Sequence, residues 1–426
     1  MESARIAAAV SARRPLAEGF FDTLRAKTFD GVGITRASYG PGEQFAHDLL
    51  RGRAAELGLE TATDAAGNSY MTLPGRDRSG NRTVIGSHLD SVAQGGNFDG
   101  AAGVIAGVTA IVALADAGWR PEADVSVMGI RAEESAWFGV SYIGSRSALG
   151  TLPDGALDDA RRADTGRTLA DHMAELGCDP ETVRRGPPHL EAASLAAYLE
   201  LHIEQGPVLE DQEIPVGIVT GIRGNLRVPA ARCVGEYSHC GGVPRSHRRD
   251  AAIAVSELVM GLDRIWDACE ARGQDFAFTV GKMATDAQRH AMTIIAGQVD
   301  FSVDMRSLDI AFLDEMEARI QEMALEIAEK RRVRFDLGRF TRAAPGILDE
   351  GIKARLREGV AALDIPAMDI PSGASHDAAA FAAAGVPTAM IFVRNANGSH
   401  NPDEAMEIDD FMKGVELLAW YLANPV

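Results

Sequence analysis

Residues 82–135, RTVIGSHLDSVAQGGNFDGAAGVIAGVTAIVALADAGWRPEADVSVMGIRAEES, predict a strand, a helix and a second strand. RTVIGSHLD and ADVSVMGIR are apolar runs of strand length, and AAGVIAGVTAIVALADAG between them has the length of a helix. AAYLELHIEQG, residues 196–206, and TAMIFVRNANGSH, residues 388–400, indicate further strands of this kind. Strands that alternate with helices are typical of a parallel sheet. The sequence therefore predicts an α/β domain with a mixed, mostly parallel sheet.

Residues 213–335 have a different pattern, in which alternating apolar and polar residues surround two amphipathic stretches. Predicted strands and two predicted helices, at residues 247–271 and 308–331, follow one another in the order βαββαβ, which is typical of a ferredoxin-like fold. A chain of 426 residues also exceeds the roughly 250 to 300 residues that one hydrophobic core usually holds. We therefore predict a larger domain made of residues 1–212 and 336–426, with residues 213–335 inserted as a smaller domain.

The formal net charge of −19 and the isoelectric point near 5.0 indicate an acidic protein. Nucleic acids and anionic membrane surfaces attract basic proteins, so we expect neither as a partner. No apolar run approaches the roughly 20 residues of a membrane helix. The first residues, MESARIAAAVSARRP, lack the apolar region of a secretory signal, and the four cysteines form no CxxC pair. We therefore expect reduced thiols and a cytoplasmic location.

Five side chains that commonly bind metals end or follow predicted strands. In open α/β sheets, ligands bind outside the carboxyl ends of the strands, so residues that end different strands converge there. Each motif alone has an ordinary structural explanation, such as a polar loop, a solvated helix end, a buried strand histidine or a turn before proline. Their shared position at strand ends favours a metal site. The candidate ligands are His88, Asp99, Glu134, His202 and His400.

The residue types indicate which metals and which chemistry to expect. Imidazole and carboxylate ligands without thiolates suit zinc, and also manganese, cobalt or nickel. We expect two divalent ions per chain, bridged by Asp99. His88 and His202 would complete one site, and Glu134 and His400 the other. Such a pair of ions can activate a shared water and polarise a carbonyl group.

Two carboxylates beside these ligands have different predicted tasks. Glu133 precedes the ligand Glu134 and is predicted to be the proton shuttle, which acts near the reacting atoms without binding the metal. Asp90 lies two residues after His88 and can accept a hydrogen bond from the free N–H of that imidazole. We therefore assign Glu133 as general acid/base and Asp90 as an orienting residue.

Six motifs occur along the chain in this order: GSHLDSV, GGNFDGAAGV, RAEESAWFG, LHIEQGPVLE, SGASHDAAAFA and GSHNPDE. In order and spacing they resemble the N-carbamoyl-L-amino acid hydrolase, allantoate amidohydrolase and β-ureidopropionase group. This hydantoinase/carbamoylase family of dinuclear metallohydrolases is related to aminoacylase and carboxypeptidase G. The resemblance spans nearly the whole chain. It implies the same five metal ligands, Glu133 as general acid/base, and a homodimer formed through the inserted domain, which acts as a lid.

The resemblance also implies two residues that act on the substrate. His239 in EYSHCGGVP matches a lid histidine that stabilises the oxyanion, within its own chain or across the dimer. Arg306 in VDMRS matches an arginine that binds the substrate carboxylate, a task for which the rigid guanidinium fork is suited. An ordinary salt bridge at a strand end is the structural alternative for Arg306.

Three positions depart from the family pattern where the family contacts its substrate. Thr293 stands at an asparagine, His290 at the earlier companion of that asparagine, and Asn225 at a glutamine. These differences predict a pocket of altered shape, in which allantoate is a poor substrate. We expect a small-molecule substrate that bears a carboxylate. The predicted substrate contacts are Arg306, Asn225, Arg227, His290, Thr293 and Gln205.

These inferences predict a metal-dependent amidohydrolase that cleaves a linear amide or ureido C–N bond of an N-carbamoyl amino acid or a related ureido acid. A metal-bridging hydroxide would attack the carbonyl, with Glu133 moving the proton. One alternative is aminoacylase or dipeptidase-type hydrolysis of N-acyl amino acids on the same scaffold. Another is a non-catalytic homologue that binds metal or ligand. Glu133 beside the five ligands argues against this second alternative, because a binding protein needs no proton shuttle.

Overall fold

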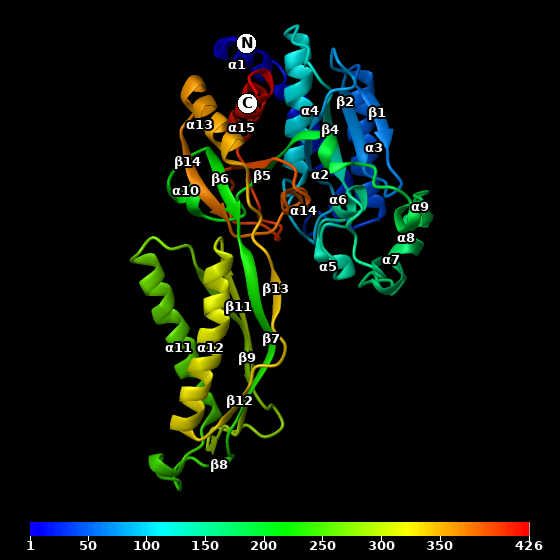
Figure 1. Ribbon diagram of the computed structural model, residues 1–426. Helices are drawn as coiled ribbons and strands as arrows, with labels where there is room; N and C mark the ends of the chain where they lie inside the picture. Colours follow the sequence, from blue (N-terminus) through cyan, green and yellow to red (C-terminus); the bar gives the residue numbers. More distant parts are fainter. Residues whose placement is uncertain (426) are drawn as a thin grey trace. The chain divides into compact units, whose positions relative to one another are not determined.

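The computed structural model describes residues 1–425, and the chain forms two compact units (Figure 1). Unit 1 comprises Met1–Thr220 and the chain from Ile347 onward, and unit 2 comprises Gly221–Gly346. The insertion therefore begins and ends later than the predicted range 213–335. Strand β6 (Val216–Ile222), which we predicted inside the insertion, pairs instead with the sheet of unit 1. Its apolar residues would suit a buried strand of either sheet, so local sequence does not assign it.

Unit 1 is built on a mixed sheet that has eight strands among the described residues. Its four central strands run parallel, because β3 pairs in parallel with β4 and β5, and β15 pairs in parallel with β5. Antiparallel strands flank this centre. The predicted α/β class with a mixed, mostly parallel sheet is confirmed. The strand order is β1 (Glu60–Thr63), β2 (Ser69–Leu73), β4 (Val125–Ile130), β3 (Arg82–His88), β5 (Leu195–Ile203), β15 (Thr388–Val393), β6 and β14 (Ala367–Ser372).

Helix α4 (Ala101–Asp116) is the central helix of unit 1 and packs against β3, β4 and β5. Nearly all of its side chains are buried, as expected for a helix covered on its other side by further helices. Gly103 allows it to approach the sheet closely, since a Cβ atom there would lie 2.2 Å from the carbonyl oxygen of Leu201. This packing fixes the start of α4 above the carboxyl ends of the strands.

Other helices of unit 1 pack against this core, whereas α7, α8 and α9 lie together at one side of the unit (Figure 1). Helices α1, α2 and α15 contact α4, and α13 contacts α15. Among the described residues, no helix has both the length and the apolar character needed to cross a membrane. The helices are α1 (Ser3–Ser11), α2 (Arg14–Thr28), α3 (Pro41–Glu56), α5 (Ser135–Phe138), α6 (Ile143–Ala148), α7 (Ala156–Asp159), α8 (Leu169–Glu175), α9 (Pro180–Arg185), α10 (Val208–Asp211), α13 (Glu350–Leu363), α14 (Asp377–Ala383) and α15 (Ile408–Ala423), with a 3₁₀ turn at Ala192–Ser194.

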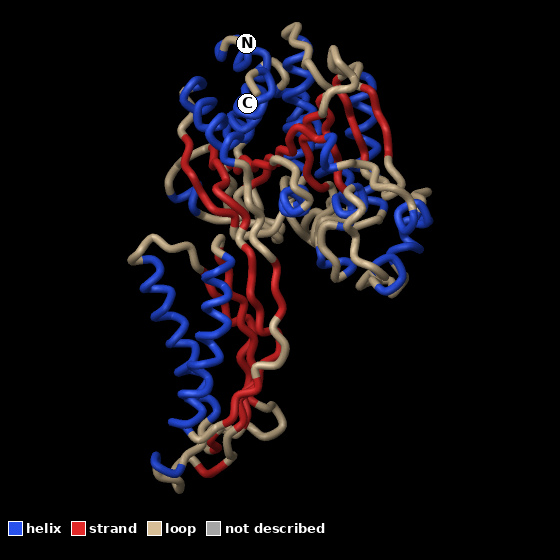
Figure 2. Tube along the Cα trace, viewed as in Figure 1, coloured by secondary structure: helices blue, strands red, loops and turns tan. Residues whose placement is uncertain are grey.

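Unit 2 has the βαββαβ order that the sequence predicts. Its antiparallel sheet has the order β12-β7-β11-β9, with β13 also pairing with β7, and helices α11 and α12 lie on one side of it (Figure 2). Alternate residues of β11 are buried, which is the pattern of a sheet with one covered face. The elements are β7 (Gly224–Val234), β8 (Ser238–His239), α11 (Ala251–Glu270), β9 (Ala277–Thr285), β10 (Ile294–Ile295), β11 (Gln298–Ser307), α12 (Ile310–Arg331), β12 (Arg334–Asp336) and β13 (Thr341–Ala343), with a 3₁₀ turn at Arg245–His247.

Candidate metal centre

The five predicted metal ligands lie together at the carboxyl ends of the central strands of unit 1. His88 ends β3, and His202 lies near the end of β5. Glu134 follows β4, and His400 lies in the loop after β15. Asp99 stands two residues before α4. Because these strands are parallel neighbours in the sheet, their carboxyl ends meet at one edge and gather residues that are far apart in sequence.

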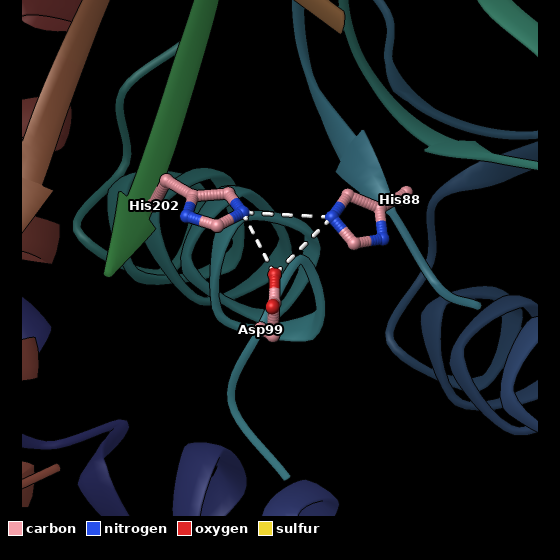
Figure 3. A group of neighbouring side chains, drawn as sticks. All are labelled: His88, Asp99 and His202. Carbon is pink, nitrogen blue, oxygen red and sulfur yellow. Dashed lines mark hydrogen bonds and ion pairs between the residues drawn. The ribbon is translucent and has the colours of Figure 1, made fainter. Parts of the chain in front are cut away.

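One group of ligand atoms is formed by His88, Asp99 and His202 (Figure 3). The Nε2 atoms of the two histidines lie 3.5 Å apart. Asp99 Oδ1 lies 3.4 Å from His88 Nε2 and 3.2 Å from His202 Nε2. All three side chains are buried. The three atoms therefore face one another in a closed part of the protein.

A second group is formed by Asp99, Glu134 and His400. His400 Nε2 lies 3.3 Å from Asp99 Oδ2 and 3.2 Å from Glu134 Oε1. Asp99 thus directs Oδ1 into the first group and Oδ2 into the second. Glu134 is buried, whereas the His400 side chain is 51% exposed. Asp99 therefore belongs to both groups, and the second group is open to solvent on the side of His400.

The donor atoms have the spacing that metal binding requires. Two ligands about 2.0–2.1 Å from a tetrahedral zinc ion are themselves about 3.3 Å apart, which matches both groups. Asp99 Oδ1 is buried and has no hydrogen-bond partner among the described residues. Backbone carbonyl oxygens of Asp90 and Ile203 lie 3.1 and 2.9 Å from Nδ1 of His88 and His202, so the ring proton sits there and Nε2 carries the lone pair that can bind a metal. In His202 this Nε2 accepts the backbone N–H of Gly100 at 3.2 Å.

The charges of the site also favour a cation. Hydrogen bonds to Asp99 and Glu134 raise the pKa of His400 to about 10. Burial acts to raise the pKa of Asp99, but the imidazole rings of His202, His400 and His88 beside its carboxylate hold it well below its usual value. The shift of His400 shows that the carboxylates of Asp99 and Glu134 place negative charge at this point, where it would favour a bound cation. Together with the donor types and spacing, these charges fit a divalent metal ion.

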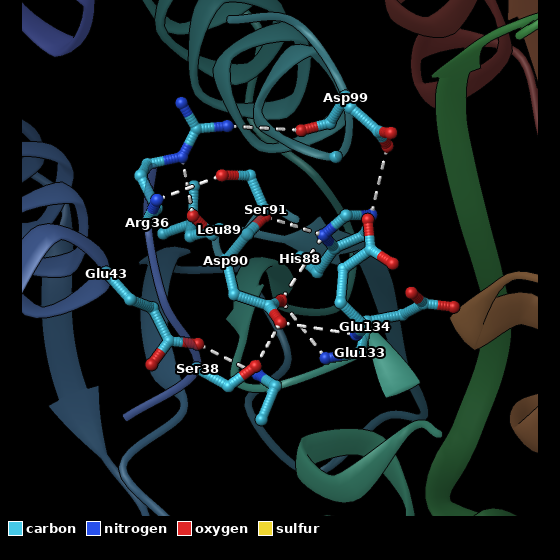
Figure 4. Close-up of polar contacts among 12 residues, drawn as sticks. Arg36, Ser38, Glu43, His88, Leu89, Asp90, Ser91, Asp99, Glu133 and Glu134 are labelled. Carbon is cyan, nitrogen blue, oxygen red and sulfur yellow. Dashed lines mark hydrogen bonds and ion pairs between the residues drawn. The ribbon is translucent and has the colours of Figure 1, made fainter. Parts of the chain in front are cut away.

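Asp90 connects the first group of ligands to the loop that carries Glu133 and Glu134 (Figure 4). Its Oδ1 lies 3.3 Å from His88 Nδ1 and accepts the backbone N–H of Glu133 at 3.0 Å. Its Oδ2 accepts the backbone N–H of Glu134 at 3.2 Å and the hydroxyl of Ser38 at 2.6 Å. Asp90 therefore lies where an orienting residue must lie, and it also holds the Glu133–Glu134 backbone, a contact that sequence alone did not suggest.

Glu133 lies beside the ligands and belongs to neither ligand group. Burial raises the pKa of its carboxyl group well above the usual value, and the nearby negative charge of Glu134 adds to this shift. A carboxyl group with a raised pKa holds a proton more readily than an ordinary carboxyl group does. The role of Glu133 as proton carrier stays a prediction.

Gly100 allows the ligand loop to pass directly beneath His88. Its backbone has φ of 65°, a left-handed conformation that favours glycine. A Cβ atom at this position would lie 2.5 Å from Cε1 and Nδ1 of the His88 ring. Any larger residue at position 100 would therefore displace a predicted ligand.

Several residues that support Asp99 were not identified from the sequence. The buried carboxylate of Glu404 accepts the backbone N–H groups of Phe98 and Asp99 at 2.9 and 3.2 Å. The Ser399 hydroxyl lies 2.7 Å from Asp99 Oδ2. Both belong to the GSHNPDE motif, where polar residues beside a candidate ligand were the available signal. Gln205, predicted as a substrate contact, donates from Nε2 to Asp99 Oδ2 at 2.9 Å.

Unit 2 carries the other predicted substrate residues on two parts of its sheet. Asn225 of β7 lies opposite Arg306 of β11, and Arg227 lies opposite Asp304. Asp304 pairs with both arginines, at 2.7 Å from Arg227 Nε and 3.0 Å from Arg306 Nε. The salt bridge considered as the alternative for Arg306 is therefore present. The binding of a substrate carboxylate by Arg306 stays a prediction.

The second part of unit 2 contains His239, Thr293 and His290. His239 in β8 pairs with Ile294 in β10, next to Thr293. The ring of His290 hydrogen-bonds to Thr285 at 2.8 Å. Nδ1 of His239 accepts the backbone N–H groups of Gly241 and Gly242, at 3.1 and 3.0 Å. Neutral His239 therefore carries its proton on Nε2, where it can be donated to a ligand.

A parallel sheet with carboxylate and histidine ligands at its carboxyl edge, and an inserted βαββαβ unit, defines a class of metal-dependent hydrolase. The sequence model of peptidase family M20/M25/M40 matches residues 84–424, and the chain belongs to this family. The resemblance to the hydantoinase/carbamoylase group is confirmed by the comparisons that follow. The protein is a metal-dependent amidohydrolase, which acts on carbon–nitrogen bonds other than peptide bonds.

The relatives cover almost the entire chain. An N-carbamoyl-L-amino acid amidohydrolase of Geobacillus stearothermophilus is 36% identical over 400 residues, which cover 92% of this chain and 94% of the relative. An allantoate amidohydrolase of Escherichia coli (strain K12) is 31% identical, with 92% of each chain covered. The crystal structure of a hydantoinase/carbamoylase family amidase from Burkholderia multivorans has a TM-score of 0.87 at 28% identity and covers 97% of this chain and 98% of that one.

Proposed function

We propose that the protein hydrolyses the ureido or amide bond of an N-carbamoyl amino acid or a related ureido acid. The observation that carries this proposal is the pair of ligand groups that share Asp99, with buried Glu133 directly beside them. The relatives named for N-carbamoyl-L-amino acids and for allantoate support ureido compounds as the substrate class.

Each ligand group would hold one divalent ion, Zn²⁺ in the first instance and otherwise Mn²⁺, Co²⁺ or Ni²⁺. His88, Asp99 and His202 form one site, and Asp99, Glu134 and His400 form the other. Such ions lower the pKa of water and polarise a carbonyl group when they are bound. Glu133 would accept a proton from the attacking water and deliver it to the leaving nitrogen.

His239 would stabilise the negative charge that develops on the substrate oxygen. The two glycine N–H groups at Nδ1 place its proton on Nε2, so the neutral ring is a hydrogen-bond donor. We also propose a homodimer formed through unit 2. Much of the exposed large apolar surface lies in this unit, on residues that include Ile253, Met260, Met292 and Leu325.

The proposed substrate class is tested by incubating metal-loaded protein with N-carbamoyl amino acids, allantoate and N-acetyl amino acids. Ammonia and the free amino acid are measured together. We expect ammonia from N-carbamoyl acids and little turnover of allantoate. If N-acetyl amino acids release acetate without ammonia, and faster than any ureido substrate is hydrolysed, the aminoacylase alternative is indicated instead.

Replacing His239 with alanine is expected to lower kcat about 10²- to 10³-fold, which is the usual loss for one oxyanion donor. His247→Ala is a matched control, because this histidine lies in an exposed part of the same unit and its side chain hydrogen-bonds only to its neighbour Ser246 among the described contacts. Unchanged kcat in His239→Ala would remove His239 from the reaction.

Mixing His239→Ala with Glu133→Gln chains shows which subunit uses His239. If His239 serves the partner's site, a mixed dimer has one complete site and regains part of the activity. If it serves its own chain, neither site in the mixed dimer is complete. Mixed dimers that exchange subunits without recovering activity would therefore place His239 in its own chain's site.

Arg306→Lys is expected to lower kcat/KM. The corresponding loss of transition-state stabilisation is about 1.5–3 kcal/mol, the contribution of a charged hydrogen bond. Lysine keeps the charge but lacks the fork that binds a carboxylate. Arg232→Lys is the control. Arg232 pairs with Asp300 in the same sheet in which Arg306 pairs with Asp304. The loss should vanish for substrate amides that lack the carboxylate. An equal loss on acids and amides would show that Arg306 has only a structural role.

A further inference from the structure

Arg36 lies behind the metal centre with its side chain fully buried. Removing a guanidinium from water is costly unless it is well compensated. Its contacts are with the backbone: Nε donates to the carbonyl oxygen of Leu89 at 2.8 Å, and Nη2 donates to the carbonyl oxygen of Asp99 at 3.3 Å (Figure 4). Its Nη1 is buried without a partner among the described residues. Full hydrogen bonding therefore does not explain the burial of this cation.

The two carbonyl groups belong to the segments that carry the first ligand group. Leu89 lies between the predicted ligand His88 and the orienting carboxylate Asp90. Asp99 supplies the carboxylate shared by both groups. A single planar side chain thus connects two ligand segments that are separated along the chain by residues 91–98.

The backbone of Arg36 is held to the same loop. Its N–H donates to the hydroxyl of Ser91 at 2.9 Å, and its carbonyl oxygen accepts the N–H of Ser91 at 2.9 Å. Two residues further on, Ser38 donates to Asp90 at 2.6 Å. The segment that contains Arg36 is therefore fixed at several points before the guanidinium reaches the ligand loops.

The electrostatic surroundings explain how the cation is tolerated. Burial lowers the pKa of the Arg36 guanidinium, and the negative charges of Glu404, Asp99 and Asp90 oppose that shift. The same carboxylates surround the ligand groups, so Arg36 is a fixed positive charge on the protein side of the centre.

We propose that Arg36 is a positioning residue that holds His88 and Asp99 at the separation that metal binding requires. This inference rests on the proposed metal centre. The Leu89 carbonyl lies next to His88, which belongs to the first group alone, so the ion held by His88, Asp99 and His202 depends on Arg36 more than the ion held by Asp99, Glu134 and His400.

The test compares Arg36→Met, which removes the fork and the charge, with Arg36→Lys, which keeps the charge alone. Zn²⁺ dissociation constants are measured by competition with a chelator, and bound Zn²⁺ is counted by elemental analysis. We expect Arg36→Met to bind its weaker ion about 10- to 100-fold less tightly than the wild type, as for other residues that orient metal ligands. Arg36→Lys should fall between the two, because it cannot reach both carbonyl groups.

Lys353→Met is the matched control. Lys353 is also a buried cation that donates to a backbone carbonyl, that of Thr220 at 2.7 Å, and it lies in helix α13. Its loss should lower the melting temperature and leave Zn²⁺ affinity unchanged. A drop in Zn²⁺ affinity in the Arg36 variants that exceeds this control separates positioning of the ligands from general stability.

Wild-type Zn²⁺ affinity and stoichiometry in a folded Arg36 variant would overturn the inference. If Arg36→Met does not fold, the Zn²⁺ affinity of Arg36→Lys tests the inference, because this variant retains the buried charge. A wild-type protein that binds no divalent ion would overturn the proposed metal centre and this inference with it. If the wild type binds Zn²⁺ and the Arg36 variants bind it equally tightly, only the inference about Arg36 is overturned and the proposed metal centre stands.

Discussion

Glu133→Gln is expected to lower turnover by roughly 10²- to 10⁴-fold, the usual contribution of general acid/base catalysis, while the metal stays bound. The amide has the shape of the carboxyl group but cannot take up the proton. Because Asp90 holds the Glu133–Glu134 segment through backbone N–H groups, the side-chain exchange should leave the ligand Glu134 in place. Turnover is measured on the preferred ureido substrate, and bound metal by elemental analysis of the same sample.

Glu416→Gln is the control for the chemical change itself. Glu416 is also a buried glutamate, but it lies in helix α15 and pairs with Lys413. This variant should retain wild-type turnover. If Glu133→Gln loses a metal ion along with its activity, Glu133 is a ligand and the assignment as proton carrier is wrong. Turnover close to that of the wild type would also contradict it.

Removing the metal is expected to abolish activity, and adding back a divalent ion should restore it. The reason is that ions held by the ligand groups would lower the pKa of water and polarise a carbonyl, which the ligand side chains cannot do without them. Activity is followed by ammonia release during dialysis against a chelator and then during titration with Zn²⁺, Mn²⁺, Co²⁺ or Ni²⁺. Circular dichroism on the same samples verifies that the metal-free protein remains folded.

The shape of the titration tests the number of ions. If two ions share Asp99, full activity should return only when two equivalents of the divalent ion are bound per chain. Asp99→Asn should weaken both sites, whereas His400→Ala should weaken the second group alone, because only Asp99 belongs to both. Full activity in protein verified to be free of metal would contradict the proposed mechanism.

The ligand positions could be predicted because two simple regularities act together. His88, His202 and Glu134 end or follow apolar stretches of strand length, which are recognisable in the sequence. The carboxyl ends of parallel strands meet at one edge of the sheet, so residues at these ends become neighbours. Through the adjacent strands β4, β3 and β5, the structure brings His88 and His202 within 3.4 Å of Asp99 and brings a Glu134 oxygen within 4.8 Å of an Asp99 oxygen.

Other parts of the site depend on contacts that local patterns do not encode. Glu404 accepts the backbone N–H of Asp99, which lies 305 residues earlier in the chain. Its place in the GSHNPDE motif indicates that a candidate ligand is near but does not identify Asp99 as the partner. Arg36 lies in a segment whose sequence is ordinary for an exposed turn, but the fold buries it behind two ligand loops. The salt bridge of Arg306 with Asp304 also depends on side-chain orientation, which strand periodicity does not specify.

The sequence by itself determined the α/β class, the βαββαβ order of the insertion and the family resemblance, because hydrophobic periodicity and short motifs are local properties. Only the tertiary structure decided that β6 belongs to the larger sheet, that Glu404 holds the backbone of Asp99, and that Asp90 also holds the backbone of Glu133. These features arise from the pairing and packing of segments far apart in the chain. Their stability depends on contacts between these distant segments, so the features exist only once the protein has folded.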